Sequence, residues 1–110
     1  MKYTFSYKAF NFFTNLNHPQ NLPGDVTTMN PYENKETQNV ISQFYKKYFN
    51  DNSKRIFIVG INPGRFGGGI TGIAFTDPIN LDEYCGIKNA FDKKQELSSK
   101  FVYKLIEPLS

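Results

Sequence analysis

The chain has 110 residues, with 13 lysines and arginines against 10 aspartates and glutamates and a formal net charge of +3. That length is enough for one small domain. A composition of 39% hydrophobic and 21% charged residues is that of an ordinary folded chain, which excludes a disordered tail, a collagen-like protein and a disulfide scaffold. The charge is compatible with a nucleic acid partner but is too small to require one.

The composition also argues against membrane and metal functions. No apolar run approaches the roughly 20 residues that span a bilayer, and the amino terminus lacks the aliphatic core of a signal peptide. We therefore expect a cytoplasmic protein with no membrane partner. One cysteine and one histidine are too few for an intrachain disulfide or a zinc site, so we expect no metal and no other cofactor.

Two helices are predicted in the first half of the chain. The first carries an apolar stripe at helical spacing from Phe5 to Leu16 and ends before His18 and Pro19. Residues 17–31 are rich in proline, glycine, asparagine and threonine and predict a long loop. The second helix is predicted over about 32–49, where five apolar residues repeat at helical spacing: Val40, Ile41, Phe44, Tyr45 and Tyr48.

A buried strand is predicted next. Residues 55–60 form a short run of β-branched and aromatic residues closed by a glycine, the pattern of a strand with both faces buried. Residues 61–78 follow directly, too dense in glycine and proline for a helix and placed where α/β folds hold ligand loops. A weak second strand is predicted over 70–75. A third helix is predicted over about 96–108, with apolar positions at Leu97, Phe101, Val102, Leu105 and Ile106.

The number of strands indicates an incomplete sheet. A strand with two apolar faces needs a neighbour on each edge and helices above and below it. One strong strand and one weak strand do not supply these partners. We therefore expect the chain to be the amino-terminal part of a longer protein, or to complete its sheet with a second copy of itself.

The glycine-rich loop is the candidate site. Gly64 and the three glycines at 67–69 let a ligand approach the backbone closely and expose amide N–H groups as donors. Pro63 pushes Asn62 towards an extended conformation at the end of the strand. The loop is not a P-loop, because Arg65 stands where that motif needs its second glycine, and the dinucleotide fingerprint is absent as well.

The stretch GINPGRFGGGITGIAF at 60–75 resembles the first motif of the uracil-DNA glycosylase superfamily. The resemblance is strongest to the single-strand-selective monofunctional branch, whose pattern runs G-M-N-P-G-P-F-G-x-x-x-T-G-V-P-F. The MNPYE segment and the helix and strand after it are similar to the family's lead-in, so the resemblance covers about 29–78. The residues that match the motif in register are Gly60, Asn62, Pro63, Gly64, Phe66, Gly67, Thr71, Gly72 and Phe75.

The chain departs from the family pattern at several points. Arg65 and Ala74 stand where the branch usually has proline. The family also supplies a base-reading asparagine on a later strand and a histidine in a later His-Pro-Ser motif, and neither can be located in this sequence. His18 precedes a proline, but it lies before the first motif, so we interpret it as a structural or solvent-exposed histidine.

The resemblance implies a fold and a reaction. The fold is the amino-terminal part of a three-layer α/β/α domain with a central parallel sheet. Residues 1–110 are then a single incomplete α/β domain whose first catalytic loop spans 60–78. The reaction is excision of uracil from DNA, in which the nucleotide is flipped out of the stack and its N-glycosidic bond is hydrolysed without a metal.

The resemblance also implies roles for residues of the loop. Asn62 would orient the attacking water near C1′, and Phe75 would stack on the flipped base. Backbone groups at Ile61, Gly64 and Gly68 would line the base pocket or hold the water.

Other residues of this region have a plainer alternative. Phe66 is a second candidate substrate contact, although core packing is the usual fate of a phenylalanine and applies equally to Phe75. Arg65 would clamp a phosphate beside the flipped nucleotide, unless it is an ordinary surface arginine. We interpret Asp77 as a turn and helix-start residue and Cys85 as a small packed residue.

Three functions are therefore open. The first is a DNA-repair glycosylase whose partner is uracil-containing DNA. The second is a catalytically incompetent unit that binds nucleic acid or a nucleobase, retaining the loop but lacking the later histidine motif. The third is an oligomerising domain in which the loop only joins structural elements.

Overall fold

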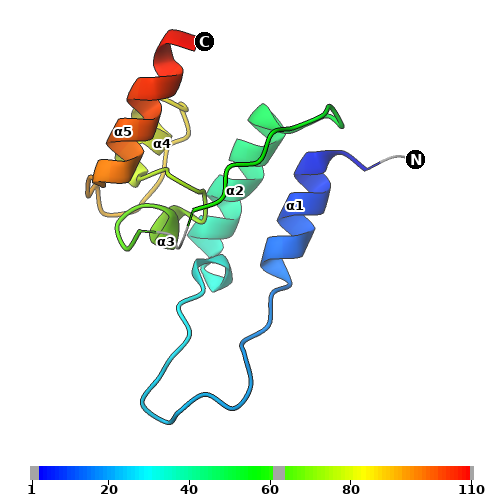
Figure 1. Cartoon of the computed structure of the whole chain (residues 1–110), viewed down its shortest axis with the longest axis vertical. Coiled ribbons are helices and arrows are strands. Elements are labelled where there is room, and N and C mark those ends of the chain that lie inside the picture. Colours follow the sequence, from blue (N-terminus) through cyan, green and yellow to red (C-terminus); the bar gives the residue numbers. More distant parts are fainter. Residues whose placement is uncertain (1–2, 61–63, 110) are drawn as a thin grey trace.

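The computed structural model describes residues 3–60 and 64–109, and its elements in this part of the chain are helical (Figure 1). Helices α1 and α2 lie side by side, and α3, α4 and α5 gather on the other side of α2. No described helix combines the length and the apolar character needed to cross a bilayer. The elements are α1 (Phe5–Thr14), η1 (Pro31–Glu33), α2 (Lys35–Tyr48), α3 (Gly68–Thr71), α4 (Pro78–Glu83), α5 (Leu97–Ile106) and η2 (Glu107–Leu109).

The two long amino-terminal helices are confirmed, and polar caps fix where they begin. The Oγ1 atom of Thr4 accepts a hydrogen bond from the backbone of Tyr7 at 3.4 Å, which starts α1. The side chain of Asn34 accepts from the backbone N–H groups of Glu36 and Thr37 at 2.8 and 3.3 Å, which starts α2. Two lysines in the last turn of α2 oppose the negative end of the helix dipole.

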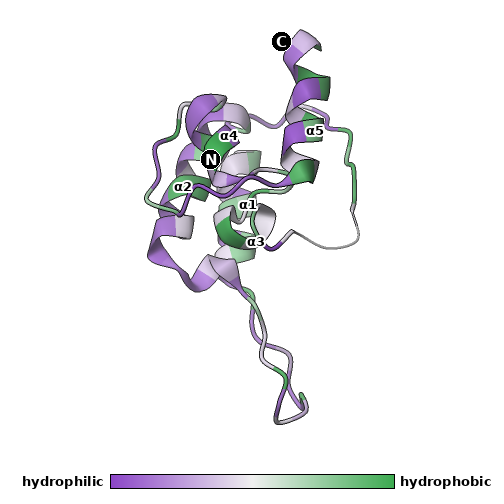
Figure 2. Ribbon diagram, turned by 90° about the vertical axis from the view of Figure 1, so that its left-hand side faces the viewer, coloured by the Kyte–Doolittle hydropathy of each residue, from purple (hydrophilic) through white to green (hydrophobic). Residues whose placement is uncertain are grey.

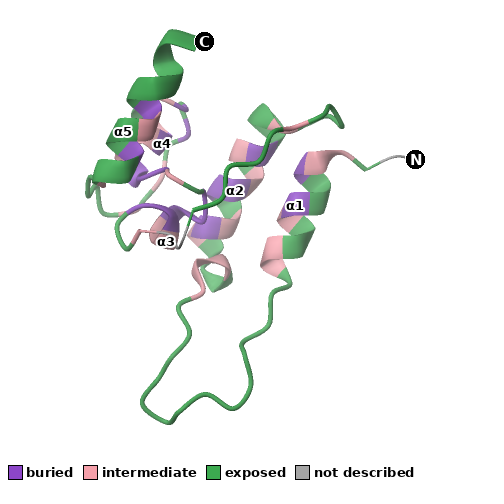
Figure 3. Ribbon diagram, viewed as in Figure 1, coloured by how far each residue is buried: buried purple, intermediate pink, exposed green. Residues whose placement is uncertain are grey.

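The core lies around α2. Val40, Ile41 and Tyr45 face inwards from this helix, as their spacing predicted, and α1 contributes Ala9 (Figure 3). Buried residues of the carboxyl-terminal part complete the same cluster: Ile73, Leu81, Cys85, Ile87 and Tyr103. The core is thus centred on α2, which also contacts α3.

The predicted loop between the first two helices is confirmed. Residues 16–29 are exposed throughout, and they form a long loop that projects away from the helices (Figure 1). His18 lies in this loop with half its side chain exposed, and its Nε2 atom contacts the carboxylate of Glu33. The interpretation of His18 as a structural or solvent histidine therefore fits its position.

The predicted strand at 55–60 is not formed as a strand. Within residues 3–60 and 64–109 no β-strand is present, so the central parallel sheet is not seen in this chain. The segment instead runs at the edge of the molecule as an extended stretch (Figure 2). Its apolar side chains are 95%, 72%, 83% and 89% exposed, from Ile56 to Val59. The physical reason is that the described part of the chain offers no neighbouring strand to pair with its backbone groups.

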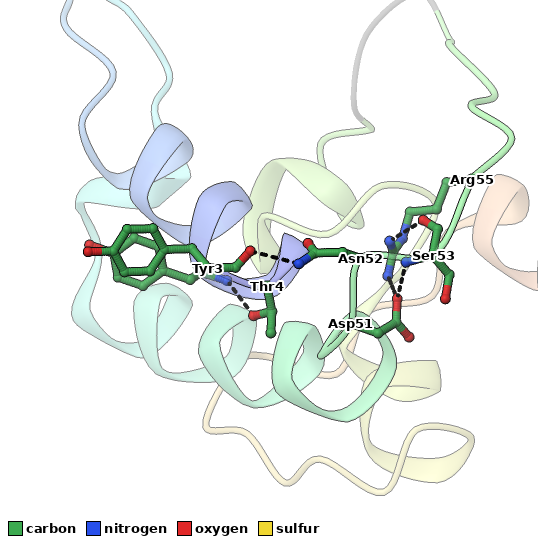
Figure 4. A network of polar contacts seen from close by, with 7 residues as sticks. Tyr3, Thr4, Asp51, Asn52, Ser53 and Arg55 are labelled. Atoms are coloured by element: carbon green, nitrogen blue, oxygen red, sulfur yellow. Dashed lines mark hydrogen bonds and ion pairs between the residues drawn. The ribbon is translucent and has the colours of Figure 1, made fainter. Parts of the chain in front are cut away.

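Polar contacts hold the start of this segment against α1 (Figure 4). The side chain of Asn52 donates to the carbonyl of Tyr3 at 3.0 Å. The backbone N–H of Ser53 and the guanidinium of Arg55 both donate to Asp51, at 3.1 and 2.8 Å, and together they lower the pKa of this carboxylate. The Arg55 guanidinium also lies 4.4 Å from the ring centroid of Phe5, so the segment leaves the helices at a defined point.

Two further predictions were wrong in part. Residues 70–75 form no strand, and the loop that seemed too rich in glycine for a helix contains the single turn of α3. Helix α5 is present, but Ser99 and Tyr103 are its buried residues, whereas Leu97, Phe101 and Leu105 point outwards. Ser99 is inside because it bonds Asp77, the capping residue of α4, and Tyr103 is inside because it bonds Thr76.

Candidate functional site

The site is the glycine-rich loop that follows the exposed segment. The predicted catalytic residue Asn62 and the predicted pocket residue Ile61 lie outside the described residues. Gly64 is the next described residue of the loop. Its carbonyl accepts hydrogen bonds from the backbones of Gly67 and Gly69 at 3.3 and 2.8 Å. A Cβ at Gly69 would lie 2.7 Å from that same carbonyl oxygen, so this tight turn requires a glycine there.

Two side chains from the amino-terminal half hold the loop on α2. The Tyr32 hydroxyl donates to the carbonyl of Gly72 at 2.9 Å, and the Thr37 hydroxyl donates to the carbonyl of Ile70 at 2.8 Å. Burial raises the pKa of Tyr32, so its hydroxyl keeps the proton that it donates. Gly72 has φ +75°, and a Cβ there would come within 2.8 Å of Tyr32 and 2.9 Å of Thr37. The glycine at position 72 is thus dictated by its contacts with η1 and α2.

The motif's threonine closes the second half of the loop. Thr71 is fully buried, and its hydroxyl donates to the carbonyl of Thr76 at 2.8 Å while accepting from the backbone of Ile73 at 3.1 Å. The hydroxyl of Thr76 in turn bonds that of Tyr103 on α5 at 2.7 Å. The loop is therefore held from both sides, by α2 and by α5.

Phe75 stands at the turn that Thr71 closes. Its φ is +55°, a left-handed backbone conformation that a bulky residue rarely adopts. Its half-buried ring lies beside Gly60, where an added Cβ would come 3.3 Å from the ring. Phe75 also lines the groove described next. A strained aromatic residue beside a groove is typical of a binding position.

An open groove of about 690 Å³ brings several of the predicted residues together. Gly64, Gly68 and Phe75 all line it, as does the exposed segment at 56–58. The opposite wall is aromatic and aliphatic, and its members come from α1, α2 and their flanks: Phe5, Ala9, Phe13, Tyr32, Phe44, Tyr45 and Phe49. Two charged residues also reach the groove, Arg55 and Glu96.

Arg65 and Phe66 lie outside this groove, on the exposed side of the loop. Two cations lie near the ring of Phe66. The guanidinium of Arg65 is 5.7 Å from the ring centroid, and the ammonium of Lys94 is 4.8 Å from it. An exposed aromatic ring flanked by two cations suits contact with a nucleic acid strand, since bases stack on the ring and phosphates meet the cations. Lys94 was missed in the sequence, because it lies in a polar stretch without periodicity.

Asp77 is confirmed as a helix-start residue. It is fully buried, and its Oδ1 atom accepts from the backbone of Asn80 at 2.8 Å, which caps α4. Its Oδ2 atom accepts from the backbone of Glu96 at 2.9 Å, and its own N–H donates to the hydroxyl of Ser99 at 3.0 Å. Cys85 is also confirmed as a packed residue, buried with its sulfur 3.4 Å from the Tyr103 hydroxyl.

Glu96 is the other residue that sequence reasoning missed. It precedes α5, and its carboxylate lies over Gly64 and Gly67, in the space where a Cβ of either glycine would stand. No sequence signal indicates this contact, because about thirty residues separate the partners. Among the described residues, no three His, Cys, Asp or Glu side chains are grouped so that they could hold a metal ion.

Comparisons with known proteins agree with the motif. No family model matches the chain, and no curated protein matches it. The structure is similar to the crystal structure of wild-type SMUG2 from Pedobacter heparinus, a protein of the uracil-DNA glycosylase family, with a TM-score of 0.88 and 42% sequence identity. The match covers 96% of this chain and 46% of that one, so the chain spans about half the length of its relative. The resemblance to this family is thereby confirmed.

Proposed function

We propose that residues 1–110 are one incomplete domain of a uracil-DNA glycosylase, with the first catalytic loop at 60–78. The observation that carries the proposal is the loop itself. Its motif residues Gly72 and Thr71 hold it in one shape on α2, so that Gly64, Gly68 and Phe75 line a common groove. The same chain is 42% identical to a protein of that family.

The reaction is hydrolysis of the bond between C1′ of the deoxyribose and N1 of uracil. The oxygen of a water molecule bonds to C1′, the electron pair of the broken bond leaves with the base, and the water's proton ends on the base or on solvent. Asn62 orients this water. Because a neutral amide is a weak base, its contribution is position and electrostatic support of the oxocarbenium-like state rather than proton abstraction.

The base occupies the groove beside the loop. Phe75 stacks on it, an arrangement that tolerates any nucleobase and that the fixed backbone at this residue favours. Backbone groups at Ile61, Gly64 and Gly68 line the pocket. At Gly68, the absence of a side chain allows the flipped base to approach the main chain closely.

DNA is the partner, and the exposed side of the loop is where its strand passes. Arg65 contacts a phosphate next to the flipped nucleotide, and Phe66 offers a ring to a neighbouring base. The support for this is the position of both side chains on the exposed face, together with Lys94 at 4.8 Å from the same ring.

The remaining part of the domain completes the fold. We place it on the segment at 55–60, where it supplies the neighbouring strands of the central parallel sheet. The support is the exposure of four consecutive apolar side chains, from 72% to 95%, on a segment whose backbone has no strand partner in the described chain. The relative is about twice as long as this chain, so it contains enough additional chain to provide such strands.

The test is uracil release from a single-stranded oligonucleotide with one uracil. The chain is assayed alone and mixed with the part of Pedobacter heparinus SMUG2 that this chain does not match, and Asn62→Ala is the control variant. We expect the mixture to release uracil and the Asn62→Ala mixture to lose at least 100-fold of the rate. Binding of the oligonucleotide without release, from a mixture that forms a complex, would instead support the catalytically incompetent binding unit.

A further inference from the structure

Glu96 occupies the position of a helix cap without acting as one. It is the residue before α5, and its carbonyl accepts from the backbone of Lys100 at 3.0 Å, as expected for that position. Its carboxylate makes no capping hydrogen bond to its own helix. The side chain instead turns away from α5 and reaches into the groove beside the loop.

The carboxylate fits a space that two glycines leave open. A Cβ built at Gly67 would lie 2.7 Å from Cδ of Glu96, and one built at Gly64 would lie 2.7 Å from its Oε1 atom with closer contacts to the rest of the group. Both distances are shorter than real Cβ contacts. A larger residue at 64 or 67 would therefore force this carboxylate to move.

Hydrogen bonds hold the backbone of Glu96 in place. Its N–H donates to Oδ2 of Asp77 at 2.9 Å, and the buried Asp77 stands at the far end of the same loop. Ser99, one turn further along α5, accepts from the Asp77 backbone at 3.0 Å and from Asn80 at 2.9 Å. Glu96 thus contacts both ends of the loop. Its backbone bonds Asp77, and its carboxylate lies beside Gly64 and Gly67.

We propose that Glu96 is a positioning residue for the first catalytic loop, and that Gly64 and Gly67 are glycines because its carboxylate fills their place. This inference rests on the proposed function. It gives a reason for the glycines at both positions. It also gives α5 a direct role in the shape of the base pocket, since Gly64 lines the groove with Glu96.

The test is a double-mutant cycle between Gly64→Ala and Glu96→Ala, read first by hydrogen exchange of the Gly67 and Gly69 amides in this chain. We expect each single substitution to speed exchange about tenfold, because each removes one half of the contact. The double variant should exchange no faster than Gly64→Ala alone, since removal of the carboxylate makes room for the new methyl group. If the exchange rate of the double variant rises by the product of the two single effects, the proposal is overturned.

A conservative variant and a kinetic readout separate positioning from a purely structural role. Glu96→Gln keeps the shape of the side chain, so it should retain the exchange rates of the natural chain. In the release assay, Glu96→Ala should lower kcat about 10- to 100-fold while KM and Tm change little. A lowered Tm with kcat intact would assign Glu96 to stability only and contradict the proposal. If the mixture that contains the natural chain forms a complex but releases no uracil, the proposed function fails, whereas the exchange cycle still decides the role of Glu96.

If Gly64→Ala fails to fold, the same cycle is run with Gly67→Ala. The added methyl group there meets the same carboxylate, so the same suppression by Glu96→Ala is expected. Failure of Glu96→Ala to restore folding in either glycine variant would equally contradict the proposal.

Discussion

At the scale of single residues, some motif residues make contacts that shape the loop and others line the groove. The sequence alone does not distinguish the two. Gly72 and Thr71 match the family pattern, yet their contacts are internal: one faces Tyr32 and Thr37, the other bonds the carbonyl of Thr76. Phe75, which matches the same pattern, and Gly68, which follows a matched glycine, line the groove. Spacing predicted that these residues belong together, but burial and φ were needed to assign each one a role.

Gly72 should be intolerant of substitution for a structural reason. Gly72→Ala places a side chain at φ +75° and within 2.9 Å of two residues of the amino-terminal half, so we expect a loss of about 3 kcal/mol in the free energy of unfolding. Urea unfolding measures this loss. Gly24→Ala is the matched control, because nothing lies within 4 Å of its Cβ position, and its change should be close to zero. Equal effects of the two substitutions would contradict the assignment.

Arg65 should act on DNA through charge alone. If Arg65 contacts a phosphate as proposed, Arg65→Ala should make the slope of log affinity against log salt shallower by about one, uniformly across DNA sequences. The measurement is a salt titration of oligonucleotide binding. Lys8→Ala, an exposed lysine on α1, is the control and should leave the slope unchanged. An unchanged slope for Arg65→Ala would leave this residue as an ordinary surface arginine.

At the scale of elements, helices with strong periodicity and caps were predictable, whereas elements defined by distant contacts were not. Helices α1 and α2 follow from apolar spacing and from Thr4 and Asn34 at their starts. Helix α5 was predicted, but its buried face was not. Ser99 and Tyr103 are inside because they bond Asp77 and Thr76. No local pattern indicates such pairings, which join residues more than twenty positions apart.

The cap of α4 should contribute more than an ordinary helix cap. Asp77→Ala removes the acceptor for both Asn80 and Glu96 inside the protein, so we expect a loss of about 2–3 kcal/mol in the free energy of unfolding. Thr4→Ala removes the exposed cap of α1 and should cost only about 0.5–1 kcal/mol by the same measurement. A loss for Asp77→Ala no larger than that for Thr4→Ala would show that the contact with Glu96 contributes nothing.

At the scale of the whole molecule, the sequence predicts a sheet that the chain cannot form alone. The run at 55–60 has the composition of a buried strand, and in the described structure its four apolar side chains stand exposed. The prediction of a strand failed because strand pairing depends on neighbours, and the described chain has none to offer. The prediction of an unfinished fold agrees with the length of the relative, about twice that of this chain.

The buried tyrosines should make the molecule sensitive to alkali. Burial raises the pKa of Tyr45 and Tyr103 well above 10.0. Unfolded tyrosines lose their protons near pH 10 while folded ones keep them, so the stability that these groups contribute is present below pH 10 and is lost as pH rises. Chemical unfolding from pH 8 to 11 should show this decline, and Tyr103→Phe should make it shallower. A free energy of unfolding that stays constant over this range would contradict the prediction.

The most direct test of the account is hydrogen exchange at the Ile56 to Val59 amides, with and without the part of SMUG2 that this chain does not match. The account predicts fast exchange in the chain alone, because the described segment has no strand partner, and protection of at least about 100-fold in the mixture, because paired strands form there. Protection that grows with the concentration of the chain alone would mean that a second copy completes the sheet. No protection in a mixture that forms a complex would contradict the claim that this chain is an unfinished glycosylase domain.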